Sequence, residues 1–278
     1  MSVGEELGRR KTAGRLEYRE RGDGPPMVFA HGAGVNGDLW RKVAPRLADR
    51  YRCIVPDLPL GGHRLPLPAE VADCSLFGQA SILAAFLEAL DVHDVTLVGN
   101  DTGGAISQAL VTSRPERVGR LVLTSCDAFE NYPPKAAAWL KPTCRLPPAL
   151  WLLTQAVRLR AVQRLPVTYG WATHEPIEPR MMESYTAPLR RSAGVRRDFA
   201  RLLTQARKED MLRASEGVAG FDRPALVVWA ADDSFFPRAH GLKLAELLPQ
   251  GRFELVERSR TFIPEDNPEP LVRLLSEF

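Results

Sequence analysis

The sequence predicts an α/β fold, in which a mostly parallel central sheet carries helices on both faces. Short runs of four to five residues, rich in valine and leucine, suit strands that are buried on both sides of a parallel sheet. Longer segments with apolar residues at helical spacing separate these runs, as right-handed β–α–β crossovers require. The expected strands are residues 27–30, 52–56, 95–98, 121–124, 225–229 and 253–256. The expected helices are residues 76–90, 102–112, 240–248 and 270–278.

The alternation of strands and helices stops between residues 128 and 220. This stretch is rich in proline and indicates short helices without strands. It holds 15 Lys and Arg against 8 Asp and Glu, a balance of +7 that leaves −4 for the rest of the chain. We therefore expect a core of residues 1–127 and 221–278, with a helical cap of residues 128–220 inserted between two core strands. Its basic charge favours a solvated helix face, although a lid that attracts an anionic substrate is the alternative.

Ligand sites in open parallel sheets lie at the carboxyl ends of the strands. We therefore expect the cap to pack over those ends and to line a cavity there with one of its tryptophans. The candidates are Trp139, Trp151 and Trp171.

The composition limits the classes of function. A chain of 278 residues, 45% of them hydrophobic, can bury one large core plus a modest insertion. A net charge of +3 does not indicate nucleic acid or an anionic membrane as a partner. No apolar run approaches the roughly 18 residues that a membrane span needs, and residues 1–16 contain no apolar leader, so we expect a cytoplasmic protein.

The cysteines have no spacing that suits metal ligands, a C-x-x-C motif or a disulfide framework, so we expect them to be buried. No metal or organic cofactor is implied, and the expected partner is a small-molecule substrate. A homodimer is one option that the sequence leaves open. The four cysteines are Cys53, Cys74, Cys126 and Cys144.

The strongest local motif is Gly99-Asn-Asp101-Thr102-Gly103, which joins a valine-rich strand directly to a helix. A tight strand-to-helix turn needs residues without a Cβ where chain and helix crowd each other, and it forces the residue between them to project outward. The helix N-terminus below offers free backbone N–H groups that favour negative charge. A carboxylate at this place can act as a nucleophile and form an ester. The alternative is an ordinary aspartate N-cap.

A second motif, His31-Gly-Ala33-Gly, follows the strand at residues 27–30, and a third, Trp-Ala-Ala-Asp-Asp233-Ser-Phe-Phe-Pro, follows the strand at residues 225–229. In order and spacing the three motifs resemble those of the α/β-hydrolase superfamily. The resemblance covers nearly the whole chain except the cap. It implies an oxyanion hole formed by the backbone N–H groups of Ala33 and Thr102. His31 in such loops is usually a structural hydrogen-bonding residue, and it is only a minor candidate for catalysis.

We call the strand-to-helix turn at Asp101 the elbow. With an aspartate at this position, the chain resembles the epoxide hydrolases and the haloalkane or haloacetate dehalogenases. In those enzymes the aspartate attacks an sp³ carbon, and a histidine then activates water to hydrolyse the ester. For the acid that orients this histidine, the resemblance favours Asp233 and leaves Asp127 as the alternative. The histidine position itself falls on Thr261, whose hydroxyl cannot accept a proton from water near neutral pH. His63 is the remaining candidate for a base.

Two further departures separate the chain from both groups of enzymes. Dehalogenases commonly have a halide-binding tryptophan after the nucleophile, where this chain has Thr102. Epoxide hydrolases use a His-Gly-x-Pro loop and cap tyrosines, whereas Gly34 stands at the proline position here. The first hypothesis is therefore a hydrolase with Asp101 as nucleophile and no identified base. The alternatives are a non-hydrolytic enzyme for rearrangement, elimination or cyclisation that uses Asp101 as acid or base, and a ligand-binding protein without turnover. The cap tyrosines that the sequence leaves unplaced are Tyr132, Tyr169 and Tyr185.

Overall fold

The computed structural model describes residues 5–278, apart from the side chains of Glu5 and Ala136. The first four residues, on which part of the N-terminal expectation rests, lie outside the described residues. The described chain forms one eight-stranded sheet in the order β1-β2-β4-β3-β5-β6-β7-β8. Neighbouring strands from β4 to β8 run parallel, whereas β2 is antiparallel to both β1 and β4. The strands are β1 (Arg10–Ala13), β2 (Leu16–Arg21), β3 (Pro26–Ala30), β4 (Arg52–Pro56), β5 (Val95–Asp101), β6 (Val118–Cys126), β7 (Ala225–Ala230) and β8 (Gly251–Val256).

The predicted α/β class is confirmed, and all six expected strands are present, as β3 to β8. The first two strands were missed. Their sequences, Arg-Lys-Thr-Ala and Leu-Glu-Tyr-Arg-Glu-Arg, lack the apolar runs of the inner strands, because β1 is an edge strand and β2 lies next to it. Only Leu16 and Tyr18 give β2 a buried apolar face.

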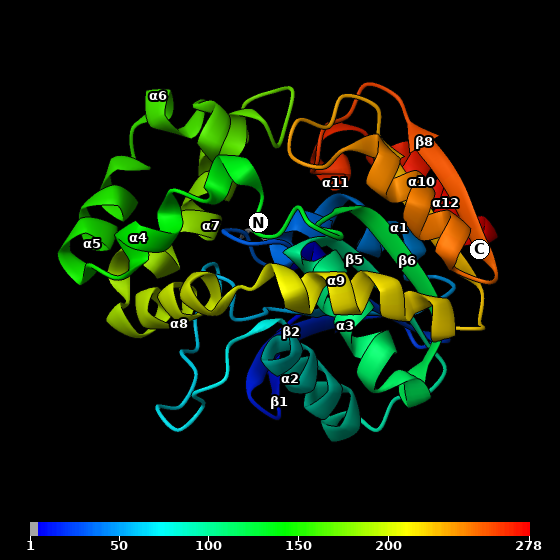
Figure 1. Ribbon diagram of the computed structural model, residues 1–278. Helices are drawn as coiled ribbons and strands as arrows, with labels where there is room; N and C mark the ends of the chain where they lie inside the picture. Colours follow the sequence, from blue (N-terminus) through cyan, green and yellow to red (C-terminus); the bar gives the residue numbers. More distant parts are fainter. Residues whose placement is uncertain (1–4) are drawn as a thin grey trace.

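Helices cover both faces of the sheet (Figure 1). The buried side chains of alternate strand positions divide into two clusters, as a sheet buried on both faces requires. One cluster contains residues of α2, α3, α9 and α10, and the other contains residues of α1 and α12. The helices are α1 (Ala44–Leu47), α2 (Leu76–Ala89), α3 (Thr102–Ser113), α4 (Leu140–Cys144), α5 (Pro147–Ala156), α6 (Arg160–Gln163), α7 (Pro179–Arg191), α8 (Ala193–Gln205), α9 (Lys208–Gly217), α10 (Arg238–Leu247), α11 (Ile263–Asp266) and α12 (Pro268–Glu277).

The segment between β6 and β7 is helical, and helices α4 to α8 gather at one end of the sheet (Figure 1). Helix α9 also falls within residues 128–220, yet it packs against α3 and helps to cover the sheet. The division into a core and a cap of residues 128–220 therefore stays a proposal, in which α9 is the part that packs with the core. None of the helices in residues 5–278 is long and apolar enough to cross a bilayer. All four cysteines are buried free thiols.

Candidate active site

Asp101 lies at a strained turn between β5 and α3. Its φ of 54° and ψ of −128° place it in a region that L-residues with side chains rarely adopt. A Cβ on Gly99 would lie 2.6 Å from the Ser107 Oγ, and a Cβ on Gly103 would lie 2.3 Å from the Ala30 carbonyl oxygen. Glycine is therefore required on both sides of the aspartate. The Asp101 side chain makes no capping hydrogen bond to α3, so it is not an ordinary N-cap.

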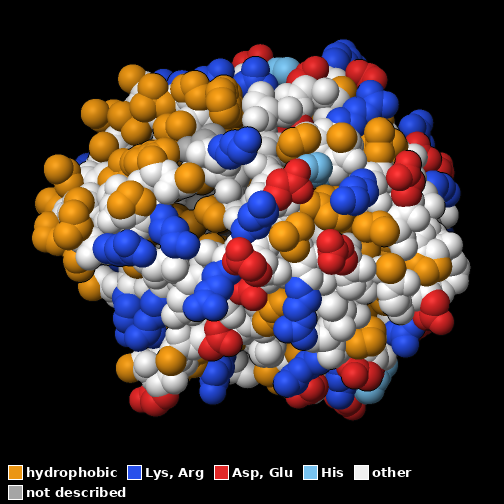
Figure 2. All heavy atoms as spheres, viewed as in Figure 1, with side chains coloured by type: hydrophobic (Ala, Val, Ile, Leu, Met, Phe, Trp, Pro, Cys, Tyr) orange, Lys and Arg blue, Asp and Glu red, His pale blue; other side chains and the backbone are white. Residues whose placement is uncertain are grey.

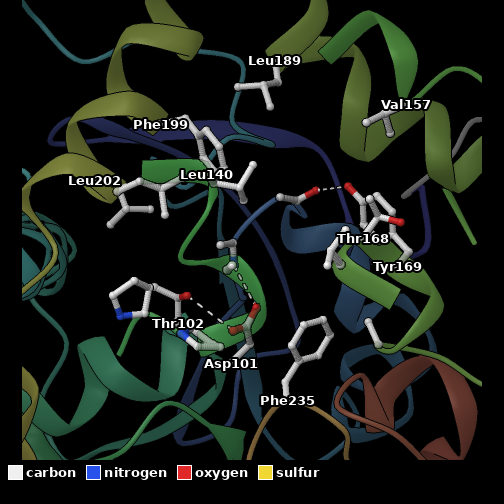
Figure 3. Close-up of a pocket in the computed structure, with 18 of the residues that line it drawn as sticks. Asp101, Thr102, Leu140, Val157, Thr168, Tyr169, Leu189, Phe199, Leu202 and Phe235 are labelled. Carbon is white, nitrogen blue, oxygen red and sulfur yellow. Dashed lines mark hydrogen bonds between the residues drawn. The ribbon is translucent and has the colours of Figure 1, made fainter. Parts of the chain in front are cut away.

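Backbone N–H groups hold one end of the Asp101 carboxylate. Oδ2 accepts from the Ala33 N–H at 3.1 Å, and the Thr102 N–H also donates to the carboxylate. The loop before Ala33 lies so close that a Cβ on Gly32 would be 2.2 Å from Asp101 Oδ2. These are the two donors expected from the resemblance. The other oxygen, Oδ1, has a longer contact of 3.4 Å with the Thr102 hydroxyl (Figure 3).

The carboxylate borders a cavity of about 220 Å³ between the elbow and the helices of residues 128–220. Figure 3 shows Asp101 and Thr102 at one end of this cavity, with Phe199, Leu202 and Leu189 across it. Most of the lining is apolar, so the cavity suits a small substrate with hydrocarbon groups. Of the three candidate tryptophans, Trp139 lines the cavity, whereas Trp151 and Trp171 are absent from its lining.

Asp233 faces Thr261, the residue that the resemblance places at the histidine position. The Thr261 hydroxyl donates to Asp233 Oδ1 at 2.9 Å, and the Phe235 and Phe236 N–H groups donate to the same oxygen. Burial raises the pKa of Asp233, although these hydrogen-bond donors lower it in part. The neighbouring Asp232 is exposed and pairs with His174 at the surface.

Asp127 is a second buried carboxyl beside the elbow. Its Oδ2 lies 3.4 Å from the Thr102 hydroxyl, which is also 3.4 Å from Asp101 Oδ1. Its Oδ1 has no hydrogen-bond partner among the described residues, although Asp127 lines the cavity. Burial, followed by the nearby Asp101, raises the pKa of Asp127 well above its usual range. Burial therefore favours the protonated form of the Asp127 carboxyl.

The same burial raises the pKa of Asp101 to about 7. The N–H groups of Ala33 and Thr102 oppose this increase, and the charge of Asp233 adds to it. Asp101 is therefore about half ionised near neutral pH, which is the range in which a carboxylate can act as a nucleophile in one state and as an acid in the other.

The two candidate histidines do not reach the cavity. His31 Nε2 accepts from the Leu58 N–H at 2.8 Å, and its Nδ1–H donates to the Gly32 carbonyl at 2.8 Å. Burial lowers the pKa of His31 to about 4, so it is neutral and ties the loops together. His63 is buried between the Gly61 N–H and Asp198. Both were minor catalytic candidates from the sequence, and neither lines the cavity.

Of the three cap tyrosines, Tyr132 is the one whose hydroxyl has no hydrogen-bond partner among the described residues. Tyr169 donates to the Gly34 carbonyl at 2.7 Å, and Tyr185 donates to Glu265 at 2.7 Å. The Tyr132 hydroxyl is buried without a hydrogen-bond partner in the described part of the chain, and Tyr132 lines the cavity. No sequence motif distinguishes Tyr132 from the other two tyrosines, because its position depends on the path of the chain after β6.

Ser125 is a residue that the sequence analysis missed. It has a φ of 23°, its Oγ accepts from the Ala230 N–H at 3.0 Å, and its side chain is also hydrogen-bonded to Asp233. Ser125 thereby holds the acid loop after β7 against the end of β6. No sequence motif marks this contact, which joins two strands that are about a hundred residues apart.

Residues 25–268 match the family described as the alpha/beta hydrolase fold, and the chain belongs to this family. Proteins of similar sequence include haloalkane dehalogenases. It is 27% identical over 274 residues to haloalkane dehalogenase 2 of Mycobacterium tuberculosis, covering 96% of this chain and 92% of that protein. It is 25% identical over 283 residues to a cis-3-alkyl-4-alkyloxetan-2-one decarboxylase of Shewanella oneidensis, covering 96% and 86%.

Solved structures agree with this fold. An α/β-hydrolase-fold protein from Burkholderia ambifaria superposes with a TM-score of 0.79 at 25% identity, covering 98% of both chains. A putative ancestral haloalkane dehalogenase superposes with a TM-score of 0.77 at 22% identity, covering 97% of both chains. No group of three or more metal-binding side chains occurs among the described residues.

We expect Asp101→Asn to stabilise the protein most at alkaline pH. The native pKa of about 7 lies above the ordinary value of an unfolded aspartate, so the native state loses stability as pH rises through 7. The amide carries no charge and removes this loss, which we expect to be about 1–3 kcal/mol near pH 8 and close to zero near pH 4. Urea unfolding of both proteins at the two pH values measures it. The exposed Asp23→Asn is the control, and equal effects at both pH values would contradict the explanation.

Proposed function

We propose that the protein is an enzyme that breaks a carbon–oxygen bond in a small, neutral and mostly apolar substrate, with Asp101 as nucleophile and without hydrolysis. One observation carries the proposal. The site has the backbone donor and the cavity that a carboxylate nucleophile needs. The acid that would orient the base of a hydrolytic second step, Asp233, instead accepts a hydrogen bond from the Thr261 hydroxyl.

The first step needs an oriented, ionisable carboxylate that faces a cavity. The Ala33 N–H binds Asp101 Oδ2, the Thr102 N–H also donates to the carboxylate, and Oδ1 faces the cavity for attack on an sp³ carbon of a bound substrate. Burial among apolar side chains keeps water away from this oxygen and makes it more reactive.

A hydrolytic second step needs a base that removes a proton from water. Thr261 cannot supply it, because a hydroxyl is far too weak a base near neutral pH. His31 and His63 lie outside the cavity. Repeated turnover therefore favours a substrate whose covalent intermediate breaks down by itself. The sequence left open a non-hydrolytic enzyme that uses Asp101 as acid or base, and the site supports non-hydrolytic chemistry in which Asp101 is instead the nucleophile.

A four-membered lactone is a substrate of this kind. Attack of Asp101 Oδ1 on ring carbon 4 breaks the bond from that carbon to the ring oxygen and leaves a free carboxylate. This carboxylate then departs as carbon dioxide. The electron pair of the broken carbon–carbon bond forms an alkene, and the bond to Asp101 breaks and restores the aspartate. No water is consumed and no proton moves, so no histidine is required. The name of the Shewanella relative describes the decarboxylation of such a ring.

Two buried polar groups of the cavity support an oxygen-containing substrate. The hydroxyl of Tyr132 and Oδ1 of Asp127 have no partner within the described residues. Burial raises the pKa of both groups and so favours their protonated forms, in which each can donate to an oxygen of the substrate. Because charge develops on the ring oxygen as the lactone opens, such donors would stabilise the transition state.

The proposal is tested by turnover of a 3,4-dialkyl-oxetan-2-one in water labelled with oxygen-18. We expect an alkene as the product and no label in the Asp101 peptide, because no water attacks the ester. Gas chromatography and peptide mass spectrometry measure the two. Asp101→Asn should abolish the alkene. A β-hydroxy acid as the main product, with label in Asp101, would instead show hydrolysis.

An alkyl halide or an epoxide should trap the intermediate, because its ester has no internal route of breakdown. We expect intact-protein mass spectrometry to show an adduct of the alkyl mass at Asp101, absent from Asp101→Asn. Thr261→His should shorten the lifetime of the adduct by about a hundredfold or more, since general bases supply roughly 10²–10⁴-fold. Thr261→Val is the matched control and should leave it unchanged. If neither an adduct nor lactone turnover occurs, the protein is a ligand-binding member without turnover.

Formation of this adduct should depend on pH. Only the ionised Asp101 attacks, and its pKa of about 7 places the midpoint near neutral pH. We expect the rate to be nearly constant above pH 8 and to fall about tenfold for each pH unit below 6. The adduct rate measured from pH 5 to 9 tests this. A constant rate over the whole range would mean that Asp101 is not the group that titrates.

A further inference from the structure

Exposed apolar side chains are concentrated on one part of the helical insertion. In the described part of the chain, six of the eight large apolar side chains that are exposed lie within residues 135–165, which we call the cap patch. Figure 2 shows hydrophobic side chains gathered over α4, α5 and α6, with Lys and Arg side chains at the border. Isolated exposed leucines are ordinary, but a contiguous group of this kind marks an interaction surface. The six are Trp139, Leu146, Trp151, Leu152, Leu159 and Leu165.

The charge of the cap patch has a single sign. No Asp or Glu occurs between Glu130 and Glu175, whereas this interval contains six Lys and Arg. None of the six forms an ion pair with a carboxylate of the described residues, unlike Arg41, which pairs with Glu265 in the core. Five of them are exposed, and Lys141 is half-buried. The six are Lys135, Lys141, Arg145, Arg158, Arg160 and Arg164.

One helix of the patch, α5, also forms a wall of the cavity. On α5, Leu150 and Leu153 line the cavity, while Trp151 and Leu152 face outward and are 48% and 65% exposed. Trp139 takes part in both surfaces, because it lines the cavity and is 40% exposed. A single short helix therefore separates the outer apolar surface from the candidate active site.

We propose that the cap patch docks on the surface of an anionic lipid bilayer. Tryptophan and leucine insert at the boundary between head groups and acyl chains, and Lys and Arg bind anionic head groups while their methylene stems remain in the apolar layer. The helices are too short to span a bilayer, so the contact is at the surface. The net charge of +3 of the whole chain conceals this feature, and it led the sequence analysis to expect no membrane partner.

A second copy of the chain fits the patch less well. A symmetric contact through the same surface would place the unpaired arginines of one copy near those of the other, and no carboxylate lies within residues 131–174 to compensate them. An anionic bilayer supplies both the apolar layer and the negative charge. Docking would also bring the apolar cavity close to the phase in which apolar substrates are dissolved. The proposal does not depend on the chemistry of Asp101.

The test is sedimentation of the full chain with vesicles. Vesicles of equal parts phosphatidylcholine and phosphatidylglycerol should bind the protein, binding should fall with added salt, and phosphatidylcholine alone should bind it far more weakly. Each basic residue near an anionic surface contributes about fivefold in affinity, so the double variant Arg158→Glu/Arg160→Glu should lose at least about 25-fold. Leu152→Ser should also weaken binding. Brominated lipid acyl chains should quench the tryptophan fluorescence of the unaltered protein.

Matched controls come from α10 and α12, outside the cap patch. Leu242→Ser makes the same substitution at another exposed leucine, and Arg273→Glu reverses an exposed charge outside the patch. Both should leave binding unchanged. The proposal is overturned by absent binding at low salt, by binding that the patch variants do not weaken or that the controls weaken equally, or by equal binding to neutral vesicles. A dimer in sedimentation velocity that Leu152→Ser dissociates, without vesicle binding, would assign the patch to self-association.

Discussion

The backbone turn at Asp101 is the constraint on which the other parts of the site depend. A non-glycine residue with a φ of 54° costs about 1–3 kcal/mol, and it persists because its surroundings leave no alternative. β5 ends in contact with β3 and β6, and α3 begins against the end of β3, so the chain has room to turn only where Gly99 and Gly103 lack a Cβ. The turn lifts the carboxylate above the sheet and presents it to the N–H of Ala33.

The electrostatic character of the site follows from this position. Three carboxyls, Asp101, Asp127 and Asp233, are brought into a region that excludes water, and burial raises the pKa of each one. Backbone N–H groups and the hydroxyls of Thr102 and Thr261 compensate part of the cost. Ionisation of these buried carboxyls lowers the stability of the folded protein. Reactive groups commonly reduce the stability of the fold that holds them in this way.

The parts of the site that could be predicted from the sequence are those fixed by local geometry. The elbow and the His31 loop were recognisable because a tight turn restricts the residue types that fit, and the inner strands because burial on both faces demands apolar runs. The edge pair β1 and β2 was missed because its charged residues face solvent or ion-pair partners. The burial of His63 against Asp198 and the free hydroxyl of Tyr132 depend on contacts between distant segments, which no local pattern encodes.

Thr261 decides how the chemistry of the elbow can be used. Its hydroxyl is a donor to Asp233, so the hydrogen bond is kept while the ability to take a proton from water is lost. A histidine there would make the site suitable for many alkyl esters, since water would release all of them. Under the proposed function, release with threonine has to come from the substrate itself, so the substrates that turn over are those with a strained ring or an internal leaving group. In the proposed mechanism the residue at position 261 thus determines substrate specificity, while Asp101 keeps its hydrogen bond from the Ala33 N–H.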